Sequence, residues 1–262
     1  MITTSMFYLA LLGILAGSLS GLLGIGGGVI LVPALMFVFG LSEHLAQGTT
    51  VALMVPPIGL LATWTYYKRG HVDLRIAALV CCGLTVGGYF GAELGFALSN
   101  TALERIFGIT LMVTAIKMLI TKKDHVSEPS NNRSTQTKIS LVCALLLIAL
   151  GLLVGCGAGL VGIGGGVLLV PALVFLFGLS QRDAQGTTLA LMVPPIGLPA
   201  AWEYYQQGTI DPTIAAAICV GFFIGALVGA RFATHLSSRL LEKVFGVSMV
   251  LIAIKMLLVG LV

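Results

Sequence analysis

Charged side chains are scarce in this sequence. Asp, Glu, Lys and Arg make up 9% of its 262 residues, while hydrophobic residues make up 58%. Soluble domains carry about 25% charged residues, so this deficit excludes an ordinary soluble domain and indicates an all-α integral membrane protein. The net charge of +4 includes no basic cluster interleaved with aromatic residues, which excludes nucleic acid as a partner.

Two further features are missing. The N-terminal stretch has no Lys or Arg before its apolar run, so it lacks the positive region of a signal peptide and is expected to remain as a span. Five cysteines lie in apolar runs, at spacings that fit neither a disulfide framework nor a zinc site: Cys81, Cys82, Cys143, Cys156 and Cys219. We expect them to be buried apolar side chains, and we expect no metal site and no cofactor.

The most informative feature that is present is an internal repeat. Residues 21–35 read GLLGIGGGVILVPAL and residues 159–173 read GLVGIGGGVLLVPAL, an offset of 138 residues. The offset holds without a gap from Gly21 to Lys117 of the first copy, with more than half of the aligned positions identical. A duplication of this kind decides the architecture before local structure is considered. It predicts two tandem homologous halves: a first membrane repeat over 1–120, a polar linker over 121–138 and a second membrane repeat over 139–262.

Each repeat contains five apolar segments. They fall near 5–24, 28–41, 47–67, 74–98 and 103–120, and near 139–161, 166–179, 185–205, 212–236 and 241–261. A full span needs about 20 residues. The segments 28–41 and 166–179 have only 14 residues each, so they are expected to be tilted, buried or re-entrant. The sequence therefore predicts about eight to ten transmembrane elements, including two short broken or re-entrant helices.

Positive charge lies on different loops in the two repeats. One loop loses its charge, because Lys68, Arg69 and Arg75 correspond to Gln206, Gln207 and Thr213. Another position gains charge, because Glu93 corresponds to Arg231. Lys and Arg concentrate in cytoplasmic loops, so the exchange predicts that the two repeats have inverted topology, as in many transporters. We expect the linker in the cytoplasm and both termini outside.

A run of glycines precedes each short segment: Gly24, Gly26, Gly27 and Gly28, and Gly162, Gly164, Gly165 and Gly166. Each glycine costs a continuous helix about 1 kcal/mol relative to alanine, so the runs predict unwound turns. The first N–H groups of the following helix lie at the positive end of its dipole and can bind an anion without a basic side chain. The alternative is close helix packing of the GxxxG kind. A phosphate-binding loop is excluded, because no strand precedes the glycines and no Gly-Lys-Ser/Thr follows them.

The motif AQGTT recurs in both repeats. It supplies uncharged polar candidates for contact with a substrate: Gln47, Thr49, Thr50, Gln185, Thr187 and Thr188. The alternative is an ordinary helix start at the membrane interface. Prolines follow in each copy, where they remove N–H donors and break a helix, so we expect them to act as hinges or to shape a cavity: Pro56, Pro57, Pro194 and Pro195.

Other polar and aromatic residues have simpler interpretations. Lys117 and Lys255 lie inside apolar runs and are either functional charges or side chains that extend to the interface. Asp73 and Asp211 precede apolar segments and are expected to cap helices, with Pro212 at the first helical position. We assign the aromatic residues at the ends of the third segments to an aromatic belt at the membrane surface: Trp64, Tyr66, Tyr67, Trp202, Tyr204 and Tyr205.

The two GxGGGxxxVPAL stretches and the two AQGTT…PP stretches resemble the TauE/SafE family of sulfite and organosulfonate exporters, and the resemblance covers nearly the whole chain. It implies a multi-pass inner-membrane permease for small sulfur-containing or organic anions such as sulfite, thiosulfate or sulfoacetate. We expect a secondary transporter working by alternating access in the bilayer, with glycine-rich faces that permit a homodimer. The alternatives are an anion channel and an intramembrane enzyme, for which Cys156 is the candidate nucleophile.

Overall fold

The computed structural model describes residues 2–24, 26–95, 140–161 and 165–233, together with scattered positions in 105–116 and 235–257. All regular secondary structure in these described residues is helical. In the described part of the chain, four helices are long and apolar enough to cross a membrane: α1 (Ile2–Leu23), α5 (Leu74–Gly95), α7 (Leu141–Val161) and α11 (Pro212–Ala233). Six helices of the same described residues are shorter: α2 (Gly28–Phe37), α3 (Glu43–Leu53), α4 (Leu60–Lys68), α8 (Gly166–Leu176), α9 (Gln181–Leu191) and α10 (Leu198–Gln206). The all-α prediction is confirmed.

Helix boundaries fall where the local chemistry requires them. The predicted segment 47–67 divides into α3 and α4, and the break between the two helices contains Pro56 and Pro57. The segment 185–205 divides in the same way. Oδ1 of Asp73 accepts hydrogen bonds from the first N–H groups of α5, and Asp211 does the same for α11. Both caps were expected from the sequence.

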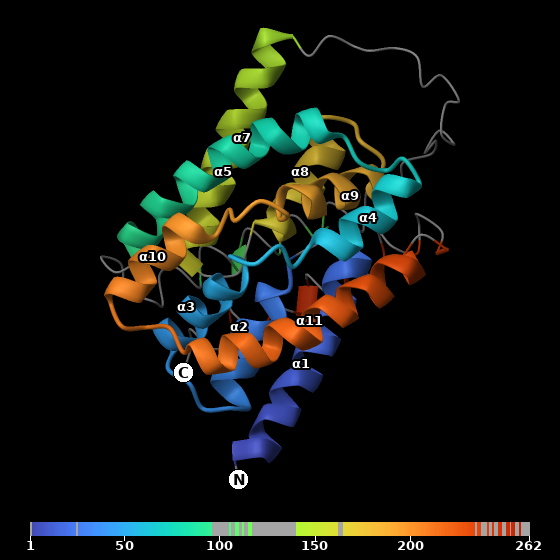
Figure 1. Ribbon diagram of the computed structural model, residues 1–262. Helices are drawn as coiled ribbons and strands as arrows, with labels where there is room; N and C mark the ends of the chain where they lie inside the picture. Colours follow the sequence, from blue (N-terminus) through green and yellow to red (C-terminus); the bar gives the residue numbers. More distant parts are fainter. Residues whose placement is uncertain are drawn as a thin grey trace.

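The long helices form two close pairs, α1 with α11 and α5 with α7 (Figure 1). Glycines make this approach possible, because a β-carbon on Gly225 of α11 would overlap the carbonyl oxygen of Ile14 in α1. Similarly, a β-carbon on Gly87 of α5 would overlap the carbonyl oxygen of Leu152 in α7. Small residues allow membrane helices to pack backbone to backbone in this way.

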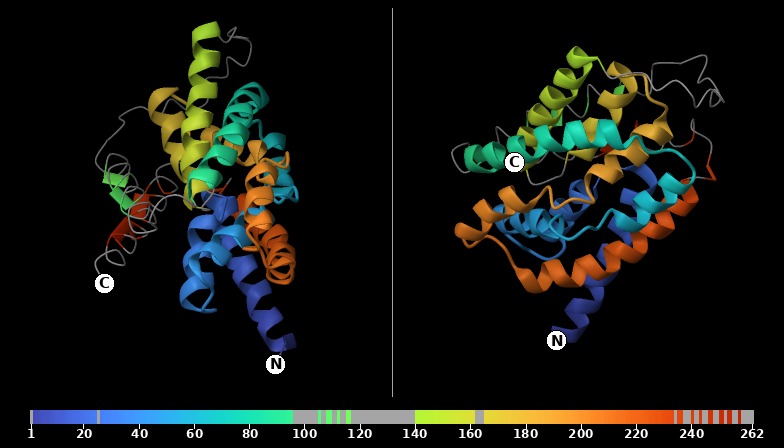
Figure 2. Two further views of the ribbon diagram at one scale, coloured as in Figure 1. Left: turned by 90° about the vertical axis from the view of Figure 1, so that its left-hand side faces the viewer. Right: turned by 45° about the horizontal axis from the view of Figure 1, so that its top comes forward.

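Direction distinguishes the two pairs. The start of α1 lies at one end of the molecule and the start of α7 lies at the other, so these helices run in opposite directions (Figures 1 and 2). Within each pair the helices run in the same direction, since successive glycines of α1 meet successive residues of α11 in the same order: Gly13 meets Ile218, Gly17 meets Phe222 and Gly21 meets Ala226.

The helices pack into two units that do not follow the order of the chain. The first packing unit contains α1, α2, α3, α4 and α11; the second contains α5, α7, α8, α9 and α10. The main contacts between the units run from α4 to α9 and from α3 to α10. Each unit therefore holds one long helix from the other part of the sequence, and the chain crosses between units just after α4 and just after α10.

Candidate functional site

The glycine run after α1 is unwound. Gly24, Gly26 and Gly27 have φ of 73°, 76° and 75°, a left-handed conformation that glycine adopts without a steric penalty. Gly28 then begins α2, so the predicted break is confirmed in this copy. In the other copy, Gly164 lies outside the described residues, and Gly165, which precedes α8, has φ of −71°.

The unwound turn lies against the AQGTT helix of the other repeat. A β-carbon on Gly24 would be 2.9 Å from Cα of Gln185 in α9, closer than real β-carbons approach. A β-carbon on Gly26 would press on the side chain of Met192, which follows the end of α9. The structure thus brings together two motifs that are remote in the sequence.

One face of each AQGTT helix carries the same three side chains. Gln185, Thr188 and Met192 follow one another at spacings of three and four residues, which places them on one face of a helix. Gln47, Thr50 and Met54 have the same spacing, with Met54 directly after the end of α3. All six side chains are buried.

Several polar atoms of this region have no hydrogen-bond partner among the described residues. They are Nε2 of Gln185 and the hydroxyl oxygens of Ser20, Thr50 and Thr188, all at most 1% exposed. An unpaired buried polar group costs about 1–3 kcal/mol, so such groups usually mark a place that a ligand or an ordered water occupies. The break after α1 and the helices α3 and α9 therefore form the candidate site.

Thr49 and Thr187 have a different role from their neighbours. The hydroxyl of Thr187 accepts a hydrogen bond from the backbone N–H of Asp73 at 3.0 Å, and Thr49 accepts one from Asp211 at 3.1 Å. These contacts attach α9 to the start of α5, and α3 to the start of α11. Substrate contact by these two threonines stays a prediction, because a hydroxyl that accepts one hydrogen bond can still donate another.

The aromatic-belt prediction is wrong for Tyr66 and Tyr204, which are at most 1% exposed. The Tyr66 hydroxyl lies 3.2 Å from the carbonyl oxygen of Gly21 and 3.4 Å from Oε1 of Gln185. Tyr204 makes the equivalent contacts in the second repeat. Its hydroxyl lies 3.1 Å from the carbonyl oxygen of Gly159 and 3.3 Å from Oε1 of Gln47. The neighbouring aromatic side chains are exposed, as a belt requires: Trp64, Tyr67, Trp202 and Tyr205.

Each buried tyrosine therefore joins three parts of the site. It connects the end of a long helix to the glutamine of an AQGTT helix, and its hydrogen bond to that glutamine crosses between the packing units. This role could not be predicted, because three aromatic residues within four positions give no local signal for which one points inward.

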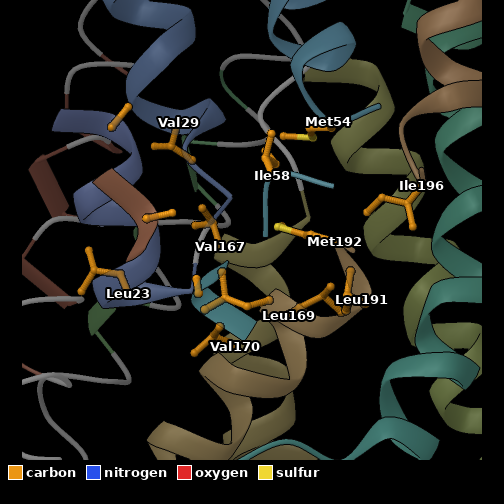
Figure 3. Close-up of a cluster of buried hydrophobic side chains, with 14 of the residues drawn as sticks. Leu23, Val29, Met54, Ile58, Val167, Leu169, Val170, Leu191, Met192 and Ile196 are labelled. Atoms are coloured by element: carbon orange, nitrogen blue, oxygen red, sulfur yellow. The ribbon is translucent and has the colours of Figure 1, made fainter. Parts of the chain in front are cut away.

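Apolar side chains fill the space beside the polar groups. Figure 3 shows Met54 and Ile58 from one repeat gathered with Met192 and Ile196 from the other, next to Val167. Methionine is flexible and fills irregular gaps without a fixed shape. Apolar side chains from both repeats therefore pack together beside the buried polar groups.

The remaining candidates are placed as follows. Gly166 begins α8 as predicted. Pro194 and Pro195 lie in the break between α9 and α10, matching the pair in the first repeat. Lys117 and Lys255 lie outside the described residues. All five cysteines are free thiols, but the expectation that they are buried is wrong: Cys82 is exposed and the other four are only partly buried. Across the described ranges, no three His, Cys, Asp or Glu side chains lie close enough together to hold a metal ion.

Comparison with known proteins agrees with the membrane architecture. The family model described as sulfite exporter TauE/SafE matches residues 9–256. A probable membrane transporter protein of Xylella fastidiosa is 31% identical over 245 residues, which cover 92% of this chain and 91% of that protein. The probable membrane transporter protein YdhB of Bacillus subtilis is 28% identical over 229 residues, covering 87% of this chain and 90% of YdhB. No solved structure matches this chain.

These similarities indicate a multi-pass membrane transporter and not an enzyme, so the hypothesis of Cys156 as a nucleophile is set aside. The match covers both glycine runs and both AQGTT motifs, from within α1 to near the end of the chain. The chain belongs to the TauE/SafE sulfite exporter family.

Proposed function

We propose that this transporter moves small sulfur-containing or organic anions, such as sulfite, thiosulfate or sulfoacetate, across the inner membrane by alternating access, in the direction of export. The observation that carries the proposal is the set of buried, unpaired polar atoms beside the unwound turn after α1. Hydroxyl and amide groups can donate hydrogen bonds to an oxyanion without adding a permanent charge.

The strength of such binding suits a cargo that must be released. Hydrogen bonds to a charged group contribute about 1.5–3 kcal/mol each, and a partly buried helix end contributes up to ~2 kcal/mol. A few such contacts give a dissociation constant of roughly millimolar to micromolar. Gln185, Thr50 and Thr188 would supply the side-chain donors, and the start of α2 would supply the dipole.

Alternating access needs two bodies that move relative to each other. We assign these bodies to the two packing units, because their mutual contacts are confined largely to α4 with α9 and α3 with α10. The tyrosine–glutamine hydrogen bonds lie in these contacts and would be remade during each cycle. Met54 and Met192 would then move aside to admit the anion, while the proline breaks at the ends of α3 and α9 act as hinges.

Inverted topology of the two repeats is part of the proposal. It is supported by the opposite directions of α1 and α7. It is also supported by a contact that occurs once in each repeat, between Tyr66 and Gly21 and between their counterparts Tyr204 and Gly159. Cysteines introduced at Ser130 in the linker and at Gln207, with the five native cysteines replaced, should be labelled by a membrane-impermeant reagent from opposite sides. Labelling of both positions from one side would contradict inverted topology.

Anion uptake into proteoliposomes tests the function directly. The parent protein should take up at least one of sulfite, thiosulfate and sulfoacetate with a rate that saturates. Gln185→Ala should raise the half-saturating concentration by about tenfold or more, because one hydrogen bond to a charged group is lost. The control Gln207→Ala removes an exposed glutamine whose side-chain amide donates a hydrogen bond to Oε1 of Glu203, and this variant should leave uptake unchanged.

Two outcomes would contradict this function. Absence of uptake for all three anions would exclude the proposed cargo class. A rate that rises in proportion to concentration without saturating would identify a channel instead of a permease.

A further inference from the structure

One histidine–carboxylate pair lies close to the candidate site. Nδ1 of His71 is 2.8 Å from Oδ1 of Asp183, and the two side chains are 22% and 41% exposed. Oδ2 of Asp183 accepts a hydrogen bond at 2.6 Å from the hydroxyl of Ser180, which caps α9. The carboxylate is therefore held in place beside a histidine, the residue type that proteins most often use to exchange a proton.

The pair joins the two packing units beside the glutamine of the site. His71 lies in the chain crossing after α4, and its backbone N–H donates to the carbonyl oxygen of Tyr66. Asp183 lies on α9, two residues before Gln185. Since the Tyr66 hydroxyl donates to Gln185, one contact joins α4 to α9 and the His71–Asp183 contact joins the segment just after α4 to the same helix. A change at the pair is therefore transmitted to the site over a short path.

The other repeat has the same backbone but no such pair. The N–H of Thr209 donates to the carbonyl oxygen of Tyr204, as His71 does to Tyr66. Thr209 is the residue that corresponds to His71, and Leu45 is the residue that corresponds to Asp183. The second repeat forms the same backbone hydrogen bond without a histidine–carboxylate pair, so this part of the fold does not require the pair.

Other charged groups near the pair make contacts of their own. The guanidinium of Arg182 donates to the carbonyl oxygen of Leu236. The carboxylate of Asp73 caps α5. On α4 and after α11, the remaining charged or titratable groups are engaged as follows: Lys68 lies over the ring of Trp64, Arg69 contacts His235, and His235 also contacts the carbonyl oxygen of Arg231. Asp183 is thus the carboxylate that directly faces His71.

We propose that His71 and Asp183 form the proton site that couples proton movement to the anion transport proposed above, on which this inference rests. In the described conformation, a proton taken from water onto the imidazole is stabilised by the carboxylate. Binding linkage then requires that the proton stabilise this conformation in return. Loss of the proton at higher pH removes the charge attraction between the packing units and favours their separation at α4 and α9. No covalent bond to the anion forms or breaks.

The experiment uses the full-length protein in proteoliposomes that contain a pH-sensitive dye, with whichever of sulfite, thiosulfate and sulfoacetate gives the highest uptake. In the parent, an anion gradient should drive proton movement, and uptake should change about fivefold or more between about pH 5.5 and 7.5. His71→Gln should retain uptake but lose both the proton movement and most of the pH dependence. Asp183→Asn, which keeps the size of the side chain, should do the same.

His235→Gln is the matched control, because it removes an imidazole outside the pair and should behave as the parent does. Proton movement that persists in both His71→Gln and Asp183→Asn, at the parental ratio to anion uptake, would overturn the inference. So would uptake by the parent that is independent of pH. Failure of the proposed function is a separate result, because then no vesicle takes up any of the three anions at any pH.

Discussion

Gly225→Val is expected to prevent stable folding. The new β-carbon would overlap the carbonyl oxygen of Ile14, and backbone atoms on both sides leave no flexible group that could move away. Overpacking costs about 1–3 kcal/mol and sometimes more, and here the whole α1–α11 contact would have to open. We expect a loss of at least about 3 kcal/mol, seen as a lower unfolding temperature and aggregation of the purified protein in detergent.

Gly157→Val is the control for this prediction. Gly157 lies on α7, also a long glycine-rich helix, but a β-carbon there would meet no atom within 4 Å. The unfolding temperature of Gly157→Val should stay near that of the parent protein. Equal stability of the two variants would show that the glycine contact between α1 and α11 does not hold the fold together.

Gly27→Ala should abolish transport while the protein still inserts into the membrane. Alanine in a left-handed conformation costs about 1–2 kcal/mol, and its methyl group would overlap the ring of Phe222. The turn after α1 would then have to shift away from Phe222 of α11. Gly165→Ala should be milder, because φ is −71° and the nearest atom, Cδ1 of Leu84 at 2.8 Å, ends a flexible side chain. Uptake rates and membrane content would be measured for both variants.

Gly40→Ala separates strain from crowding. Gly40 has φ of 70°, but a β-carbon there would meet no atom within 4 Å. This variant carries the same backbone strain as Gly27→Ala and should still transport. If Gly27→Ala and Gly165→Ala both transport at the parental rate, the glycines serve packing alone and the proposed site is wrong.

Local chemistry was sufficient to predict the breaks and caps of the fold. Consecutive glycines destabilise a helix, which predicted the turn that contains Gly24, Gly26 and Gly27. Proline lacks an N–H group, which predicted the separation of α3 from α4. Aspartate before an apolar run predicted the caps at Asp73 and Asp211. Each of these effects acts within about four residues, so the sequence alone displays it.

The exchange of long helices could not be predicted in this way. Helices that face lipid on one side and protein on the other are apolar all round, so periodicity does not identify the partner of α1. Likewise, the contact between His71 and Asp183 depends on two residues more than a hundred positions apart. The polar site itself was predicted in part, since Gln185 and Thr188 were named from their motif, whereas Tyr66 and Tyr204 were not.

The exchanged helices also have a consequence for synthesis of the protein. The glycine face of α1 leaves the ribosome first, but α11 begins roughly 190 residues after α1 ends. At about 5–20 residues per second, α1 waits about 10–40 s for its partner. During that time its glycine face contacts lipid or another protein, while α5 and α7 can already pair. The α5–α7 pair of the second packing unit is therefore expected to form before the α1–α11 pair of the first, which has to wait for α11.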